Sequence, residues 1–247
     1  MSLNLNSTLQ FEKIQKVHQI LQDPKRKFIV IDGIIGAGKT TLIKMIIEKF
    51  AKDEKYNNNN IEKVIKIKAI YEPVAKWNET GALQYFYQDI QKNCYEFQTY
   101  SYITRIASVI DEIYDCQDAD IYILERSIWT DKYIFMELLK DDAGELRMNM
   151  YDEWCKNWAY ILPMRVDKWV LLNTSLEESI KRIISRNRNG EDAISVEYQT
   201  KLYEKHIEFY DNLKKQNESV IIIDSKLMDN DFINDDVNLN NIISQIF

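Results

Sequence analysis

Glycine, proline, cysteine and histidine are scarce in this 247-residue chain, which holds six, three, three and two of them. Three of the six glycines, Gly33, Gly36 and Gly38, fall within one short segment, where a functional loop is expected. His18 and His206 lie in helix-like stretches without a partner pattern, so no zinc site or histidine mechanism is indicated and both are interpreted as structural. The odd number of cysteines, without metal-ligand spacing, predicts reduced thiols in an intracellular protein. The cysteines are Cys94, Cys116 and Cys155.

Long apolar runs are also missing. No stretch approaches the roughly 18 to 20 apolar residues that a membrane span needs, and the N-terminal MSLNLNSTLQ has no apolar signal core. The formal net charge of −7 argues against a broad basic surface for nucleic acid or anionic membrane. We therefore expect a soluble, cytoplasmic or otherwise intracellular protein without nucleic-acid or membrane partners. A small anionic substrate would need a local basic site.

Five short apolar runs alternate with helix-like stretches. This alternation predicts an α/β fold in which a parallel sheet of about five strands is covered by helices. Residues 11–22 have apolar positions at helical spacing before Pro24, so residues 1–26 are predicted to be a helical extension for packing or dimer contact. Residues 27–247 are predicted to form a single domain. The predicted strands are 28–31, 64–70, 121–124, 169–172 and 220–223, and the predicted helical stretches are 41–50, 75–116, 128–160, 175–186 and 195–215.

The segment 33–40, GIIGAGKT, fits the phosphate-binding pattern G-x-x-x-x-G-K-[ST], with a predicted strand before it and a helix after it. Backbone N–H groups of such a loop wrap phosphates, and the following helix N-terminus favours anions. Lys39 can meet the β- and γ-phosphate oxygens and Thr40 can ligate Mg²⁺. The predicted ATP-binding residues of the loop are Gly33, Gly36, Ala37, Gly38, Lys39, Thr40 and Thr41.

A phosphate loop alone does not separate kinases from GTPases, ATPases or nucleotide-dependent switches. The D-x-x-G sequence at 141–144 follows a helix-like stretch instead of a strand, and the guanine signature N-K-x-D is absent. Both observations disfavour a GTPase, so other residues have to decide the class.

Five segments, the phosphate loop among them, carry that decision: IDGIIGAGKTT, YEPVAKW, a tyrosine-rich stretch ending in FQTYSYITRI, LERSIWTDKYIF and RIISRNRNGED. With these segments in this order, residues 27–224 resemble the deoxynucleoside kinase family, which includes deoxycytidine, deoxyguanosine and mitochondrial-type thymidine kinases. The resemblance implies a P-loop kinase fold with an arginine-rich lid, Mg²⁺ with ATP as phosphate donor, and a role in nucleotide salvage. It also implies a homodimer formed through a helical face.

Glu72 follows a predicted strand and precedes Pro73. It should therefore lie at the carboxyl edge of the sheet, where open α/β folds bind ligands. A carboxylate there could accept the proton of an attacking hydroxyl. The resemblance implies that Glu72 is the general base for the nucleoside 5′-hydroxyl, and an exposed loop carboxylate is the alternative.

Glu125 and Arg126 end the apolar run 121–124 with adjacent opposite charges, which would be costly in a core. The resemblance implies that Glu125 lies near Mg²⁺ and the nucleoside, and that Arg126 holds the 5′-oxygen and the phosphate region. A structural ion pair is the alternative. The predicted catalytic residues are Glu72, Arg126 and Lys39, and the predicted metal-binding residues are Thr40 and Glu125.

Gln98, Ser101 and Arg105 follow one another at i, i+3 and i+7, so a helix turns all three toward one side. Gln98 offers a paired donor and acceptor, and Asp131 could orient Arg105. The resemblance implies that Gln98 reads the base and that the pair of Arg105 and Asp131 sets base choice. Together with Ser101, the pair resembles the deoxyguanosine and deoxycytidine kinases more than the thymidine branch. A solvated helix face with an ordinary salt bridge is the alternative.

Four aromatic residues complete the predicted nucleoside site. Phe97 and Phe135 could supply apolar faces for the base, and Trp77 could wall the pocket beside Glu72. Tyr87 falls where the family places a tyrosine on the sugar 3′-hydroxyl. Core packing explains the two phenylalanines and the tryptophan equally well.

Arg182 and Arg186 precede the polar turn RNGED between two helix-like stretches, and Arg188 is the first residue of the turn. Cations at such a place could close over the phosphates as a lid and neutralise charge on the transferring group. The resemblance implies this role for the arginines and a 3′-hydroxyl contact for Glu191, whereas a solvated basic helix end is the alternative. Asp224, at the end of the last predicted strand, could approach the ATP base.

The sequence thus predicts a deoxynucleoside kinase that transfers the γ-phosphate of ATP to the 5′-hydroxyl of a deoxynucleoside. Purine deoxynucleosides are favoured, then deoxycytidine. Two alternatives stay open. A nucleoside monophosphate kinase of the thymidylate kinase type shares the loop and lid but needs extra cations for the acceptor phosphate, and a catalytically silent nucleotide-binding protein would keep the loop and lose the base.

Overall fold

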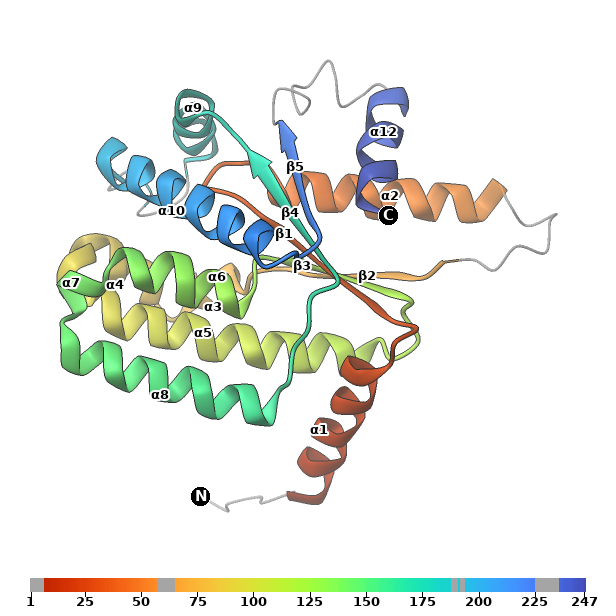
Figure 1. Cartoon of the computed structure of the whole chain (residues 1–247), viewed down its shortest axis with the longest axis horizontal. Helices are drawn as coiled ribbons and strands as arrows, with labels where there is room; N and C mark the ends of the chain where they lie inside the picture. The colour runs from red at the N-terminus through yellow and green to blue at the C-terminus, as the bar shows by residue number, and fades with distance from the viewer. Residues whose placement is uncertain (1–6, 57–64, 188–190, 192–193, 225–235) are drawn as a thin grey trace.

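The computed structural model describes residues 7–56, 65–187, 191, 194–224 and 236–247. Five parallel strands form one sheet in the order β2-β3-β1-β4-β5, so the central strand is the first in the chain (Figure 1). All five strands predicted from the sequence are present, with ends that differ by at most three residues. Their bounds are β1 Lys27–Asp32, β2 Ile67–Ile70, β3 Ile121–Glu125, β4 Lys168–Asn173 and β5 Val220–Asp224.

Helices cover the sheet on both sides: in Figure 1, α5 and α8 run side by side below it and α2 lies above it. Because both faces are covered, the central strands are continuous apolar runs instead of alternating ones. The helices are α1 Ser7–Gln22, α2 Lys39–Tyr56, α3 Val74–Glu79, α4 Ala82–Gln88, α5 Ile90–Asp115, α6 Ile128–Thr130, the π-helix η1 Asp131–Met136, α7 Lys140–Ala143, α8 Glu145–Ile161, α9 Leu176–Arg186, α10 Val196–Lys215 and α12 Asp236–Ile246.

The predicted helix at residues 11–22 is present as the longer helix α1, which packs against α5. Val17, Ile20 and Leu21 on this helix are at most 5% exposed and belong to the main hydrophobic core. The predicted extension therefore packs against the rest of the chain and contributes to its core.

The two long helix-like stretches are each divided. Gly81 and Gly144 adopt positive φ values of 71° and 78°, which L-amino acids rarely adopt, and each precedes a new helix. A π-helix, η1, continues α6 without a break. Such wide turns are frequent at functional sites, and this one carries both Asp131 and Phe135.

The three cysteines are free thiols, of which Cys94 and Cys155 are buried and Cys116 is partly exposed. Among the described residues, no helix combines the length and the apolar character that crossing a membrane requires.

Candidate active site

The predicted phosphate loop connects the carboxyl end of β1 to the start of α2, at the centre of the sheet. Gly33, Gly36 and Gly38 all have positive φ, at 147°, 80° and 97°. A Cβ on Gly33 would lie 2.8 Å from the carbonyl oxygen of Leu172, and one on Gly36 would lie 2.6 Å from that of Ser179. Both neighbours are backbone atoms, so the loop keeps its shape only with glycine at these positions.

Lys39 is 5% exposed and donates hydrogen bonds to the carbonyl oxygens of Gly33 and Ile34, each at 3.1 Å. Burial and the nearby positive charge of Arg126 lower the pKa of Lys39 to about 8, although Glu72 and other carboxylates oppose the shift. The amino group is therefore held over the loop, where an added anion would favour its charged form.

Thr40 and Glu125, predicted to bind a metal, are brought together although 85 positions separate them. The Thr40 hydroxyl donates to Glu125 Oε1 at 2.6 Å, and both side chains line the main cavity. A hydroxyl that donates its proton keeps its lone pairs for a cation, and Mg²⁺ prefers one or two protein oxygens together with substrate phosphates. The donor set of one hydroxyl and one carboxylate fits Mg²⁺.

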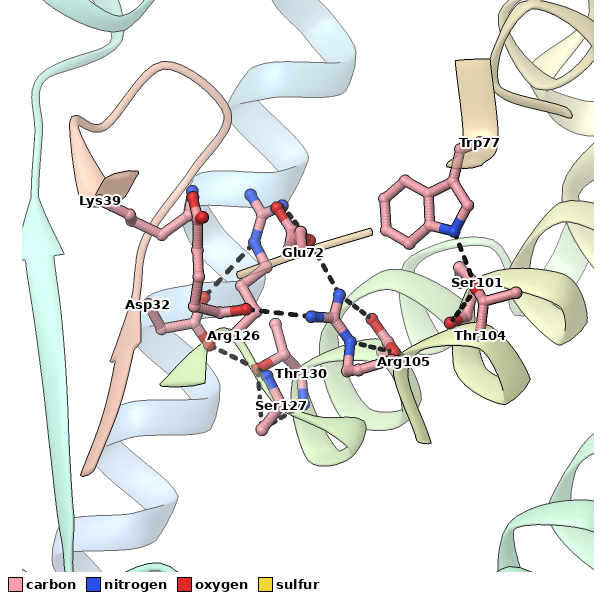
Figure 2. Close-up of polar contacts among 12 residues, drawn as sticks. Asp32, Lys39, Glu72, Trp77, Ser101, Thr104, Arg105, Arg126, Ser127 and Thr130 are labelled. Atoms are coloured by element: carbon pink, nitrogen blue, oxygen red, sulfur yellow. Dashed lines mark hydrogen bonds and ion pairs between the residues drawn. The ribbon is translucent and has the colours of Figure 1, made fainter. Parts of the chain in front are cut away.

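Glu72 lies two residues beyond β2, between two guanidinium groups, as Figure 2 shows. Arg126 Nη1 donates to both carboxylate oxygens at 2.9 and 3.0 Å, and Arg105 Nη2 donates to Oε1 at 2.8 Å. Burial would raise the pKa of Glu72, but the two arginines outweigh it and lower the pKa to about 2. The carboxylate is consequently ionised throughout the physiological range.

The predicted pair of Arg105 and Asp131 is present and buried. Arg105 Nε and Nη2 donate to the two Asp131 oxygens at 2.7 and 3.0 Å, and Nη1 donates to the backbone carbonyl of Glu125 at 3.0 Å. Burial raises the pKa of the Asp131 carboxyl against the opposing charge of Arg105. Because its planar guanidinium group contacts η1, β3 and Glu72 at once, Arg105 is held in one orientation.

Arg126 has a backbone φ of 62°, in the left-handed region that non-glycine residues rarely adopt. Its N–H donates to the carbonyl of Ile31 in β1, its Nη2 donates to the carbonyl of Gly33, and its guanidinium stacks 4.7 Å from the centre of the Phe135 ring. Strain of this kind costs about 1 to 3 kcal/mol and persists only where surrounding contacts enforce it. Here the conformation aims Arg126 from the end of β3 at Glu72.

These residues surround one cavity of about 370 Å³. Phe86 stacks on Phe97 with ring centres 4.5 Å apart, Trp77 meets Phe97 edge-on, and the Trp77 indole N–H donates to Thr104 at 2.8 Å. The lining thus combines aromatic side chains with a larger number of charged and polar ones, so the cavity can pack against a planar ring and form hydrogen bonds with its edge. All eleven residues predicted to contact the nucleoside line it: Glu72, Trp77, Tyr87, Phe97, Gln98, Ser101, Arg105, Arg126, Asp131, Phe135 and Glu191.

The predicted lid residues occupy different places. Arg182, on α9, donates to the loop carbonyl of Ala37 at 3.1 Å and to Glu178 at 2.9 Å. Arg186, at the end of α9, lines the cavity and forms a two-bond ion pair with Glu191 at 2.5 and 2.6 Å. Arg188 lies outside the described residues.

Other predicted ATP-binding residues lie beside the cavity instead of lining it. Gly33, Ala37 and Gly38 form the loop behind Lys39, and Thr41 is exposed on the first turn of α2. Asp224 ends β5 opposite Asn173, at the outer edge of the sheet.

Several site residues were not predicted. Phe86 and Tyr198 line the cavity but stand in the sequence as ordinary aromatic residues of helices. Asp32, the last residue of β1, is fully buried beside Arg126. A charged residue closing an apolar strand was the signal used for Glu125, and it could have identified Asp32 as well.

A phosphate loop on the central strand of a parallel sheet, facing a buried carboxylate and arginines across an aromatic cavity, defines a P-loop kinase of small molecules. The chain matches the family model described as "Deoxynucleoside kinase" over residues 29–247, and it therefore belongs to the deoxynucleoside kinase family. It is an enzyme of that family, as the sequence predicted.

Curated relatives agree with this assignment. The chain is 29% identical to a probable deoxycytidine kinase of fowlpox virus over 223 residues, which cover 90% of this chain and 87% of that protein. It is 28% identical to human deoxycytidine kinase, covering 73% and 74% of the two chains, and 29% identical to a Dictyostelium discoideum deoxyadenosine kinase, covering 76% and 68%. A solved deoxyadenosine kinase from M. mycoides shares the fold, with a TM-score of 0.67 at 22% identity over 88% of this chain and 97% of that one.

Proposed function

We propose that this enzyme transfers the γ-phosphate of ATP to the 5′-hydroxyl of a deoxynucleoside. The observation that carries the proposal is one cavity that has the phosphate loop on one side and the Glu72 carboxylate with aromatic side chains on the other. Such a cavity can hold a phosphate donor and an aromatic acceptor close enough for in-line transfer.

In this mechanism Glu72 binds and orients the 5′-hydroxyl and takes its proton. Because its pKa is about 2, Glu72 is a weak base that would accept the proton late, as bonding to phosphorus advances. That order suits phosphoryl transfer, whose transition state is loose and needs little early activation of the nucleophile.

Lys39, Arg126 and the α9 arginines supply positive charge around the transferring group. Thr40 and Glu125 would hold Mg²⁺, whose chemistry is to neutralise charge on the β- and γ-phosphates. Arg186 and its partner Glu191 lie at the cavity wall, where the arginine can meet phosphate and the carboxylate can meet a sugar hydroxyl. A salvage role, returning free deoxynucleosides to the nucleotide pool, is consistent with this reaction.

The base is proposed to lie between the aromatic residues, with its polar edge toward Gln98 and the pair of Arg105 and Asp131. Ser101 donates to the carbonyl of Gln98 at 3.0 Å, which places a small side chain at this edge. Purine deoxynucleosides and deoxycytidine are therefore favoured, and the deoxycytidine and deoxyadenosine kinases among the relatives are consistent with that choice.

The deciding experiment is ADP release from Mg-ATP with each of the four deoxynucleosides, the matching ribonucleosides and dTMP as separate acceptors. Turnover with deoxyadenosine, deoxyguanosine or deoxycytidine is expected. Preference for thymidine would overturn only the choice of base. Preference for dTMP would replace the acceptor class with a nucleoside monophosphate.

A homodimer is proposed as well, through the exposed face of α8. Leu146, Met150, Trp154 and Ile161 on this helix are 75%, 47%, 44% and 44% exposed. Their spacing places them on one side of the helix, so they form a continuous apolar stripe that a second copy of the chain would cover.

A further inference from the structure

His206 and Asp32 form a buried contact behind Arg126, although 174 positions separate them. His206 is 1% exposed and Asp32 is completely buried. Imidazole Nε2 lies 3.2 Å from Asp32 Oδ1, and Nδ1 lies 2.7 Å from the backbone carbonyl of Leu202. The contact joins the middle of α10 to the end of the central strand.

Asp32 connects four parts of the active site. Its Oδ1 accepts the backbone N–H of Gly33 at 2.8 Å, and its Oδ2 accepts the Thr130 hydroxyl at 2.7 Å. It also faces Arg126 Nε at 3.6 Å, as Figure 2 shows. The carboxylate therefore links the phosphate loop, the turn after β3 and α10 around the guanidinium of Arg126.

The carboxylate of Asp32 determines the direction of its contact with His206. An ionised carboxylate only accepts hydrogen bonds, so the ring nitrogen that faces it, Nε2, is the donor of this contact. The N–H of His206 thereby satisfies the buried Asp32 carboxylate from the side of α10.

Arg126 depends on this arrangement for its orientation. Among the described residues its Nε has no hydrogen-bond acceptor within bonding distance, and Asp32 is the carboxylate that faces it. If Asp32 turned toward Nε, it would lose its bonds to Gly33 and Thr130. The donor from His206 opposes that turn, so Arg126 keeps its other nitrogens on Glu72 and Gly33.

We propose that Asp32 and His206 are positioning residues for Arg126, and that the N–H donated by His206 to Asp32 is needed for full kcat. The inference rests on the role proposed above for Arg126 in phosphoryl transfer. Neither residue touches the reacting groups. Each acts through Arg126 and the phosphate loop.

A matched pair of variants tests this role. His206→Gln places an amide N–H where Nε2 stands and keeps a donor to Asp32, whereas His206→Asn keeps only a donor near the position of Nδ1. We expect His206→Gln to retain kcat within about threefold and His206→Asn to lose about tenfold or more, the range expected when an outer partner of a working group is removed. The KM values for deoxynucleoside and ATP should change little in either variant. Lys205→Ala, on the same helix, is the control and should match the wild type.

The result that overturns the proposal is an equal change of kcat in both His206 variants, including no change in either. Glu72→Gln, measured alongside, distinguishes a failure of the positioning role from a failure of the proposed reaction. If Glu72→Gln loses turnover while the His206 variants do not differ, the proposed reaction stands and the positioning role fails. If the wild type turns over no deoxynucleoside, the proposed reaction itself fails.

A spectroscopic measurement needs no variant of the site. The chain has only two histidines, so ¹⁵N NMR with a His18→Asn sample assigns the ring of His206 directly. A hydrogen on Nε2 is expected. An Nε2 without a hydrogen would contradict the proposed donor to Asp32.

Discussion

Arg126 Nη1 donates to both carboxylate oxygens of Glu72, at 2.9 and 3.0 Å. The arginine that is proposed to hold the phosphate region therefore also fixes the group proposed to receive the proton. Acceptor activation and charge stabilisation are coupled through one side chain.

Replacing the Glu72 carboxylate should affect turnover and spare ATP binding. For Glu72→Gln we expect kcat to fall about 10²- to 10⁴-fold, the contribution of a positioned acid or base. ATP affinity, measured by calorimetry, should stay near the wild-type value, because the phosphate loop is intact. Glu79→Gln, on the exposed end of α3, is the control. An equal loss of turnover and ATP affinity would count against the base assignment.

The acid stability of the protein should report the charge of Glu72. Its pKa is about 2 in the folded state against an ordinary value of 4.5, so its stabilising contribution is complete above pH 4.5 and is lost as the pH falls toward 2. The contribution is on the order of 3 kcal/mol. Urea unfolding of wild type and Glu72→Gln should give a constant difference above about pH 5 that shrinks at lower pH. A difference that stays constant down to pH 3 would show that the two arginines do not stabilise this carboxylate.

Gly36 should tolerate no side chain. The Cβ of Gly36→Ala would lie 2.6 Å from the Ser179 carbonyl oxygen, so the loop must move and ATP affinity should fall sharply. Gly81→Ala is a matched control, because its φ of 71° is also positive but no atom lies within 4 Å of the added carbon. That control should cost about 1 to 2 kcal/mol of stability and leave ATP affinity unchanged. Equal ATP affinities in the two variants would refute the steric argument.

Removing Asp131 should leave the buried charge of Arg105 without its main partner. We expect Asp131→Ala to lower the free energy of unfolding by about 3 to 5 kcal/mol and to change the preference among deoxynucleosides. Glu177→Ala, which breaks the exposed ion pair with Lys181, should change the free energy of unfolding far less. Urea titration and the acceptor assay measure both effects. Unchanged base preference in a folded Asp131 variant would remove the pair from the specificity site.

The apolar stripe on α8 should control the oligomeric state. If it is the dimer contact, Trp154→Glu should convert a dimer to a monomer in sedimentation velocity, because a charge would be buried against apolar side chains. Lys201→Glu, exposed on α10, should leave the dimer intact. A wild-type protein that sediments as a monomer would contradict the proposed interface.

The strands were predictable because each is a short apolar run between helical stretches, and the three central ones, β1, β3 and β4, are buried on both faces. The breaks at Gly81 and Gly144 and the π-turn at Asp131 were not predicted, since the flanking sequence keeps its helical character. Residues inside a motif, such as Lys39 and Glu72, were identified through local pattern and family resemblance. The contact of His206 with Asp32 was missed, because it joins distant positions and neither residue has a neighbouring pattern that indicates a partner.

The left-handed backbone at Arg126 costs about 1 to 3 kcal/mol of strain, which the buried ion pair of its side chain with Glu72 outweighs. Glycine would relieve the torsional strain, yet it would remove the guanidinium on which Glu72, Gly33 and Phe135 converge. A stabilising library that ranks residues by backbone torsion alone would therefore choose glycine at position 126 and obtain a less stable protein, so engineering of this enzyme should exclude the position from such a library.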